Sequence, residues 1–316
     1  AAAISLAGAA LLCHRKPKNT RFYAREGYVT VALCWLVLAV IGALPFVLSR
    51  EIPFFIDALF ETVSGFTTTG ATILGDVEAL SHASMLWRCL THWVGGMGVL
   101  VFMLIVLPLA GGQTIFLMRA ESPGPAVSKM SPHMRDTATI LYAIYFGLTV
   151  LQMILLLIGG MPFFDAICVS LGTAGTGGFG NWNDSIAHYN SAYLQNVITV
   201  FMILFGINFS AYFLILTRKF RQAFRIEEIR VYLGVIFVFA GLIAFNVRPM
   251  FGSLRESFHH ALFQVASIIT TTGFSTVDFD QWPTFSRALL VLLMFIGACA
   301  GSTAGGIKIS RLILLF

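Results

Sequence analysis

A fourteen-residue pattern occurs three times in this chain, and each copy lies between two long apolar stretches. Every copy starts with apolar, helix-forming residues and ends in a turn rich in threonine and glycine. The copies span residues 57–70, 165–178 and 260–273, so their final glycines are 108 and 95 residues apart. Self-similarity at such a long period decides the architecture, because each copy must build the same local structure. The pattern predicts three units, each made of a helix, a short re-entrant helix, a turn and a second helix.

The composition indicates a membrane protein. The chain is 57% hydrophobic and only 11% charged, against about 25% charged in an average soluble domain. Several apolar runs reach the roughly 20 residues that a helix needs to cross a bilayer. We therefore expect an all-α polytopic membrane protein. The predicted spans are residues 28–48, 85–109, 138–159, 192–216, 231–247 and 287–316, preceded by the end of another helix at 1–12. The five cysteines show no metal-ligand spacing and are interpreted as small apolar residues.

The charged residues are unevenly distributed along the chain. Fifteen of the twenty basic residues lie in the stretches 15–25, 119–135, 218–230 and 308–311, whereas ten of the fifteen acids lie near the three threonine/glycine turns. Basic loops stay in the cytoplasm, so the turns are predicted to face the outside. An acidic outer mouth concentrates cations.

These boundaries divide the chain into six predicted parts. Three are repeats, each a helix, re-entrant loop and helix, and three are the segments that precede or connect them. The segments are 1–26, 119–137 and 218–230, and the repeats are 27–118, 138–217 and 231–316.

The residue types in the turns suit a site for a dehydrated cation. Glycine accepts a positive φ and leaves no side chain in the way, and threonine adds a hydroxyl to its carbonyl oxygen. The short helices, predicted at 57–66, 165–173 and 260–269, would direct their negative C-terminal ends at a shared axis. Irregular backbone at this depth is tolerated where it lines a cavity. The predicted ligands are the backbone carbonyls of Thr68, Thr69, Gly70, Thr176, Gly177, Gly178, Thr271, Thr272 and Gly273.

Five segments carry a resemblance to a known family. They are FETVSGFTTTGAT at 60–72, WVGGMG at 93–98, RAESPGP at 119–125, TTTGFST at 270–276 and GACAGSTAGGIK at 297–308. In this combination the chain resembles the Trk/Ktr/HKT superfamily of potassium transport proteins, and within it the bacterial TrkH branch. The resemblance covers nearly everything from residue 28 onward.

The resemblance implies a K⁺ uptake pathway in a bacterial inner membrane, with four such repeats around one pseudo-fourfold pore. Glycine at each filter position goes with K⁺ over Na⁺ in that family, and Gly70, Gly178 and Gly273 match. It also implies K⁺ as the transported ion, no organic cofactor, a homodimer in membrane lipid, and a cytosolic nucleotide-binding regulatory ring of the TrkA kind. No nucleic-acid partner is expected. Since only three repeats are found, we expect the sequence to be a fragment that lacks the C-terminal fourth repeat and the first helix of the whole protein. The alternative is a three-repeat protein that another subunit completes.

A second small-residue segment interrupts the last apolar run. It comprises Gly301, Ser302, Thr303, Ala304, Gly305, Gly306 and Lys308. The resemblance implies a helix break that places a gating loop beneath the filter, with the Lys308 ammonium repelling cations. Close helix packing through Gly297 and Gly301 is the alternative, and Lys308 can equally be an interfacial lysine that reaches water.

Other functions stay open as alternatives. The same pore can serve an H⁺- or Na⁺-coupled symporter, and an unrelated solute carrier would instead need inverted repeats. The intramembrane polar residues His92, Gln152 and Asn208 are candidates for lining a pathway, and Arg88 and Glu61 for an outer-side pair. No catalytic motif is found, and no enzyme activity is expected.

Overall fold

The computed structural model describes residues 24–98, 134–223 and 225–315. The predicted helix end at 1–12, the basic stretch 15–23, residues 99–109 of the second predicted span and most of the 119–137 segment lie outside these ranges. The described residues form α-helices joined by loops and short 3₁₀ turns. The α-helices are α2 (Ala24–Leu48), α3 (Phe55–Phe66), α4 (His82–Gly96), α7 (Met134–Ile158), α8 (Phe163–Ala174), α9 (Ala192–Phe205), α10 (Phe209–Leu216), α11 (Phe220–Ala223), α12 (Glu227–Val247), α13 (Leu254–Ile269), α14 (Thr284–Phe295) and α15 (Ile309–Leu315). The 3₁₀ turns are η1 (Ser185–His188), η2 (Arg248–Met250) and η3 (Phe279–Gln281).

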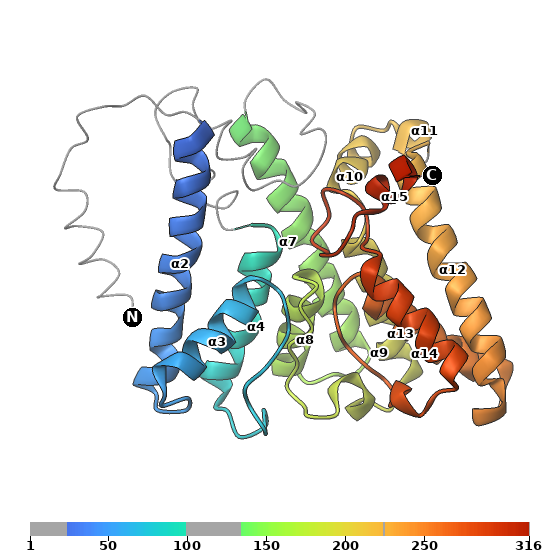
Figure 1. Cartoon of the computed structure of the whole chain (residues 1–316), viewed down its shortest axis with the longest axis horizontal. Helices are drawn as coiled ribbons and strands as arrows, with labels where there is room; N and C mark the ends of the chain where they lie inside the picture. Colours follow the sequence, from blue (N-terminus) through green and yellow to red (C-terminus); the bar gives the residue numbers. More distant parts are fainter. Residues whose placement is uncertain (1–23, 99–133, 224, 316) are drawn as a thin grey trace.

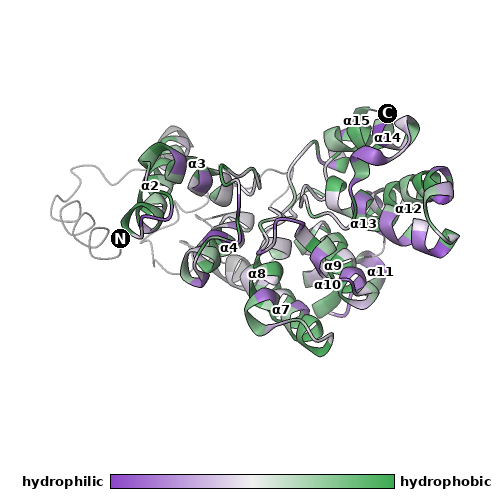
Figure 2. Cartoon of the chain, turned by 90° about the horizontal axis from the view of Figure 1, so that it is seen from below, coloured by the Kyte–Doolittle hydropathy of each residue, from purple (hydrophilic) through white to green (hydrophobic). Residues whose placement is uncertain are grey.

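The helices form three groups that follow one another along the chain (Figure 1). Each group has a long first helix, a short middle helix and a second helix. In each, the middle helix packs against both others: α3 against α2 and α4, α8 against α7 and α9, and α13 against α12 and α14. Neighbouring groups meet where α4 packs on α8 and where α9 packs on α13. Seen from below, the groups lie in an arc with the loops between them (Figure 2).

Within the described residues, three helices are long and apolar enough to cross a membrane, namely Tyr28–Leu48, Thr139–Ile158 and Glu227–Met250. They are the first helices of the three groups. Apolar side chains such as Leu36 (64% exposed) and Phe245 (75% exposed) lie on their outer surfaces, as expected of helices that face lipid. Many buried polar groups of the described residues are hydrogen-bonded, as membrane depth demands. Five buried side-chain atoms among these residues have no hydrogen-bond partner: His92 Nε2, Gln152 Oε1, Ser170 Oγ, Asn181 Oδ1 and Gln264 Oε1.

The middle helices end where the sequence predicted. Predicted C-terminal ends at residues 66, 173 and 269 compare with observed ends at Phe66, Ala174 and Ile269. Their N-terminal ends begin up to six residues earlier than the predicted copies. In the third group the reason is a cap, since the Ser253 hydroxyl accepts a hydrogen bond from the Glu256 N–H at 3.2 Å.

The second helices differ from the prediction. The run 192–216 was expected to be one span, but it is broken between α9 and α10 by a 93° bend. The run 287–316 is broken between α14 and α15, so the predicted helix break is present. Asn208 stabilises the first break, because its side chain caps α10 by accepting from Ser210 N at 2.8 Å.

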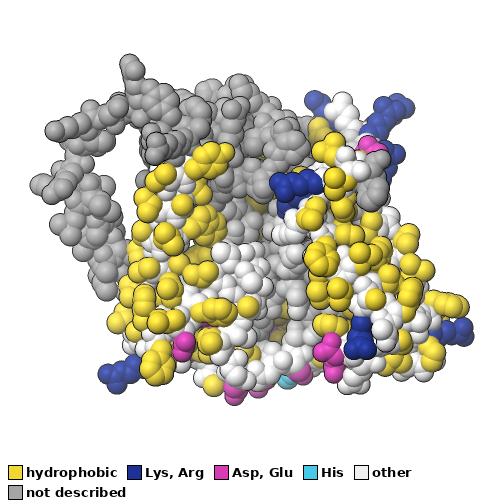
Figure 3. Space-filling view, viewed as in Figure 1, with side chains coloured by type: hydrophobic (Ala, Val, Ile, Leu, Met, Phe, Trp, Pro, Cys, Tyr) yellow, Lys and Arg dark blue, Asp and Glu magenta, His cyan; other side chains and the backbone are white. Residues whose placement is uncertain are grey.

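The charged side chains separate along the long direction of the helices. In Figure 3 acidic side chains gather along the lower edge of the molecule beside a few basic ones, and a basic group stands at the upper right near α10, α11 and α12. The broad sides between these edges are largely apolar.

Candidate functional site

The three turns after the middle helices share one backbone conformation. The residue after each helix cap is a threonine in the left-handed region: Thr68 has φ 54°, Thr176 has 53° and Thr271 has 58°. Two residues later a glycine is also left-handed: Gly70 has φ 76°, Gly178 has 78° and Gly273 has 86°. A β-branched residue at positive φ is unusual and costs about 1–2 kcal/mol. Three such residues in one register indicate a conformation held for a purpose.

The hydrogen bonds of each turn determine which way its carbonyls point. One carbonyl in the last turn of each middle helix accepts the N–H that follows the left-handed threonine. The pairs are Thr69 N to Ser64 O (2.9 Å), Gly177 N to Gly172 O (3.1 Å) and Thr272 N to Ser267 O (2.9 Å). In a trans peptide the C=O points opposite to the N–H. The carbonyls of Thr68, Thr176 and Thr271 therefore point away from their own helices.

Adjacent turns touch through their glycines. A Cβ added to Gly70 would lie well inside van der Waals contact with the Gly177 carbonyl oxygen, and one on Gly178 would collide in the same way with the Thr272 carbonyl oxygen. For Gly273 no described atom lies within 4 Å of that position. The predicted filter residues of one group thus contact those of the next group along the chain, with a glycine of the first against a carbonyl oxygen of the second.

The side chains behind the turns differ between groups. Ser64 donates its hydroxyl to the Ala71 carbonyl (2.5 Å), and Ser267 donates to the Phe274 carbonyl at the equivalent place (2.6 Å). The second group has Gly172 there, where a Cβ would lie 2.6 Å from the Phe179 carbonyl oxygen.

In this second group the support comes from His92 of α4. Its Nδ1 accepts from Phe179 N at 3.3 Å, its ring stacks on the Phe179 ring, and a Cβ on Gly177 would meet it. The acceptor role requires the tautomer with the proton on Nε2. His92 is fully buried, so the structure places it behind the turn rather than on an open pathway.

A buried ion pair between α3 and α4 of the first group also contacts the second group. Arg88 Nε lies 2.5 Å from a carboxylate oxygen of Glu61, with 3% and 0% of the two side chains exposed. The same carboxylate accepts from the Thr72 hydroxyl and the Ile73 N–H, both at 3.0 Å. Arg88 also donates to the Gly180 carbonyl, and its guanidinium covers the Phe179 ring. The predicted pair is confirmed, and it connects the outgoing strands of two turns.

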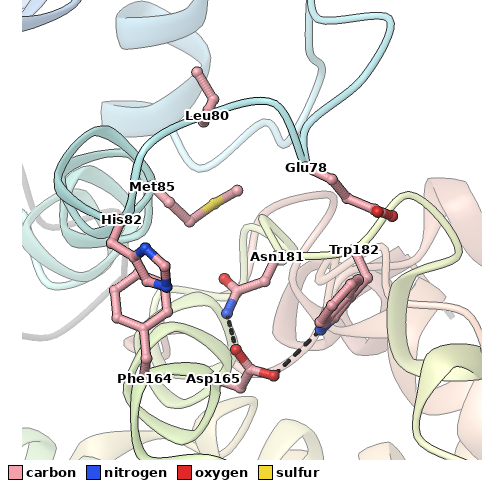
Figure 4. A pocket seen from close by; sticks show the side chains of 8 residues that line it. All are labelled: Glu78, Leu80, His82, Met85, Phe164, Asp165, Asn181 and Trp182. Carbon is pink, nitrogen blue, oxygen red and sulfur yellow. Dashed lines mark hydrogen bonds between the residues drawn. The ribbon is translucent and has the colours of Figure 1, made fainter.

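Similar polar contacts hold the outer loops. Asp165 accepts from Asn181 (2.7 Å), Trp182 (3.2 Å) and Tyr189 (2.7 Å), and in the third group His260 Nδ1 pairs with the Thr276 hydroxyl at 2.9 Å. Asp165, Asn181 and Trp182 line a pocket of about 160 Å³ between the first two groups. Figure 4 shows the Asp165 carboxylate between Asn181 and Trp182.

The two loops that flank this pocket are also bonded to each other. Asn183 donates to the Asp76 carboxylate at 2.7 Å, and this bond holds the pKa of that exposed carboxyl below its ordinary value. Asn183 Oδ1 in turn accepts from Val77 N at 3.0 Å.

The small-residue segment lies directly against the third turn. The Gly305 N–H donates to the Thr271 hydroxyl at 2.8 Å. The Thr303 hydroxyl donates to the Phe205 carbonyl at 3.3 Å, and Lys308 is buried with its ammonium on the Ala304 carbonyl. The snorkelling alternative for Lys308 does not describe this position.

Other contacts fix the segment to the break between α9 and α10. Cys299 N donates to the Gly206 carbonyl at 3.1 Å, and Phe209 N donates to the Gly301 carbonyl at 3.0 Å. The breaks in the two second helices therefore contact each other next to the third turn.

Sequence reasoning missed Glu228, Ser64 and Ser267. It also missed the break at Gly206, although a signal existed. Gly98, Gly206 and Gly301 repeat at the same 108- and 95-residue offsets as the filter glycines. Gln152, considered for a pathway, is buried and donates to the Thr173 hydroxyl at 2.9 Å.

Comparisons with known proteins agree with this geometry. A family model described as "TrkH: Cation transport protein" matches residues 1–316. The chain is 40% identical over 299 residues to the Trk system potassium uptake protein TrkH of Salmonella typhimurium, covering 93% of this chain and 62% of that protein. It is 39% identical over 308 residues to the protein of the same name from Escherichia coli K12, covering 96% and 64%.

Among solved structures, the crystal structure of the potassium transporter TrkH from Vibrio parahaemolyticus superposes with a TM-score of 0.84 at 31% identity. It covers 98% of this chain and 64% of that chain. The present chain thus spans somewhat under two thirds of the length of these relatives.

Proposed function

This chain belongs to the TrkH family of cation transport proteins, and on that basis we propose that it forms most of the ion pathway of a potassium uptake protein. The observation that carries the proposal is the repeated turn. Three segments, each held by its own helix carbonyl, direct backbone oxygens away from their helices and abut one another through glycine. Rings of such oxygens replace the hydration shell of K⁺ in selective pores.

In this proposal the ligands are the carbonyls of the predicted filter residues in all three turns. The repeats that carry them stand around one pseudo-fourfold axis, with the basic loops in the cytoplasm and the turns outside. A fourth segment of the same kind closes the ring beside Gly273, where nothing described lies against the glycine. K⁺ is the ion because the relatives bear potassium uptake names and because glycine, not serine, occupies the first filter position.

The proposal extends to regulation and assembly. Residues 301–308 act as the gate, since Gly305 of this segment donates a hydrogen bond to the Thr271 side chain of the third turn. The complete protein works as a homodimer in a bacterial inner membrane and is controlled by a cytosolic nucleotide-binding partner, in keeping with relatives named as parts of a Trk system.

The test uses the complete protein in liposomes. Flux of K⁺, Rb⁺, Na⁺ and Li⁺ is followed under each ion's own gradient with no other driving ion. K⁺ and Rb⁺ flux well above Na⁺ and Li⁺ flux is the expected result. Flux that starts only when an H⁺ or Na⁺ gradient is added would mean that the protein is a coupled transporter and not a channel. Equal flux of all four ions would overturn the filter assignment.

A further inference from the structure

One buried carboxylate on the first helix of the third group contacts both flanks of the small-residue segment. Glu228 lies in the first turn of α12 and is 9% exposed. Its Oε1 accepts the N–H of Ala300 at 2.6 Å and the N–H of Ser310 at 3.2 Å. These two donors lie on either side of residues 301–308, so a single oxygen joins both ends of the segment.

An acid in the first turn of a helix usually stabilises that helix by opposing its dipole. Glu227 fits that description, because it lies in the same turn and is exposed. The two partners of Glu228, in contrast, both belong to the segment and its flanks. Its bonds therefore hold the segment rather than α12.

The remaining contacts of the segment have neutral acceptors. The Phe205 carbonyl and the Thr271 hydroxyl hold its middle, and the Gly206 carbonyl holds Cys299 just before it. Hydrogen bonds to an ionised acceptor are about twice as strong as neutral ones. Among the described contacts, the two to Glu228 are thus the strongest that oppose movement of the segment.

We propose that Glu228 is a positioning residue that latches both ends of the gate to α12 and so keeps the gate under the third turn. The inference rests on the proposed function and names how that same pore is kept closed. When the latch is lost, the gate leaves the pathway more often, and the pore opens without its regulatory partner. The filter itself is untouched, so ion preference stays the same.

The experiment compares variants of the complete protein in planar bilayers without a regulatory partner. Glu228→Met removes the acceptor and keeps the bulk, and we expect its open probability to rise about tenfold or more. Glu228→Gln keeps a neutral carbonyl oxygen in place, so a rise of about two- to fivefold is expected. Glu227→Met and Glu227→Gln are the matched controls and should equal the parent. The K⁺/Na⁺ permeability ratio should be the same in all five proteins.

A second readout follows the gate directly. A cysteine at position 302, made by Ser302→Cys, is treated with a water-soluble thiol reagent from the cytoplasmic side. The quantity compared is the reaction rate of the Ser302→Cys protein minus that of the protein that keeps Ser302 in the same background. This difference should increase in the Glu228→Met background and stay constant in the Glu227→Met background. If Glu228→Met does not fold, Glu228→Gln decides both readouts. An open probability and a reactivity equal to the parent would overturn the latch.

The two proposals fail differently. A parent protein that passes K⁺ no better than Na⁺ contradicts the proposed function, whatever Glu228 does. A parent that selects K⁺, with Glu228 variants that gate like the Glu227 controls, contradicts the latch alone. A changed permeability ratio in Glu228→Met would also overturn it, because the residue would then act on the filter.

Discussion

The half of the groups that carries the turns and the half that carries the breaks in the second helices follow opposite rules. At the ends of α3, α8 and α13 the backbone is the same three times, to within 5° in the φ of the left-handed threonine. The second helices of the second and third groups, in contrast, differ from each other. A 93° bend separates α9 from α10, and a long non-helical segment separates α14 from α15.

This difference matches two kinds of task. A cation that loses its water must be surrounded by equivalent oxygens, so each segment around the axis has to repeat the same conformation. Closing a pore needs only one obstruction, and a single segment can supply it while its neighbours serve as its docking surface. Under the proposed function, the repeats stay alike where they bind the ion together and differ where one of them supplies the gate.

The largest effect is expected from Gly178→Ser. The new Cβ would collide with the Thr272 carbonyl oxygen, and the backbone at φ 78° disfavours any side chain. The K⁺/Na⁺ permeability ratio should fall by about tenfold or more, since one carbonyl is displaced from the ring. Gly75→Ser is the control, because open space surrounds Gly75 and the ratio should not change. An unchanged ratio in Gly178→Ser would mean that the turns are not the filter.

Arg88→Met should have the next largest effect, this time on stability. It leaves the Glu61 carboxylate buried without its cation, a change that typically costs about 3–5 kcal/mol. The midpoint of thermal unfolding in detergent should drop by several degrees, whereas Arg287→Met, at an exposed position, should leave it nearly unchanged. The double variant Glu61→Gln with Arg88→Met should recover part of the loss. If Arg88→Met unfolds like the parent, the buried pair does not stabilise the protein.

Gly306→Ala tests the other side of the comparison, the breaks in the second helices. Gly306 has φ 72° and an added Cβ would lie 3.0 Å from Gly297 Cα. The strain of about 1–2 kcal/mol should change the open probability several-fold, with no change in the permeability ratio. Gly234→Ala, in open space on α12, should change neither quantity. Loss of selectivity in Gly306→Ala would show that filter and gate are not separable.

The smallest effect is expected from Ser267→Ala. It removes the hydroxyl bond to the Phe274 carbonyl, worth about 1 kcal/mol, and should lower the permeability ratio about twofold or less. Ser64→Ala should match it, because the first turn has the same bond. Two clearly different results would show that the turns are alike in conformation but not in their share of the ion.

Much of this organisation could be predicted from the sequence. The threonine/glycine turns repeat in register, so the ends of α3, α8 and α13 were predicted to within one residue. The Glu61–Arg88 pair could be suspected, since both lie in predicted membrane segments where an unpaired charge is costly.

The rest depends on contacts between distant parts of the chain. Glu228 is one of two adjacent acids at a helix start, and nothing local tells which one turns toward Ala300 and Ser310. His92 could be recognised as an intramembrane polar residue, but its role behind Phe179 follows only from the packing of α4 on α8. The bend at Gly206 escaped notice because the apolar run continues through it.

The contacts of Gly70 and Gly178 with the carbonyl oxygens of the next turn have a consequence for how such a protein can diverge. A change in one turn displaces the oxygen of its neighbour, so no turn can be altered independently without disturbing the ring. The residues behind the turns are free of that constraint, and they already vary: serine in the first group, histidine from another helix in the second, serine again in the third. Ion preference in related sequences should therefore be retuned through these supporting side chains, while the lining itself stays nearly the same.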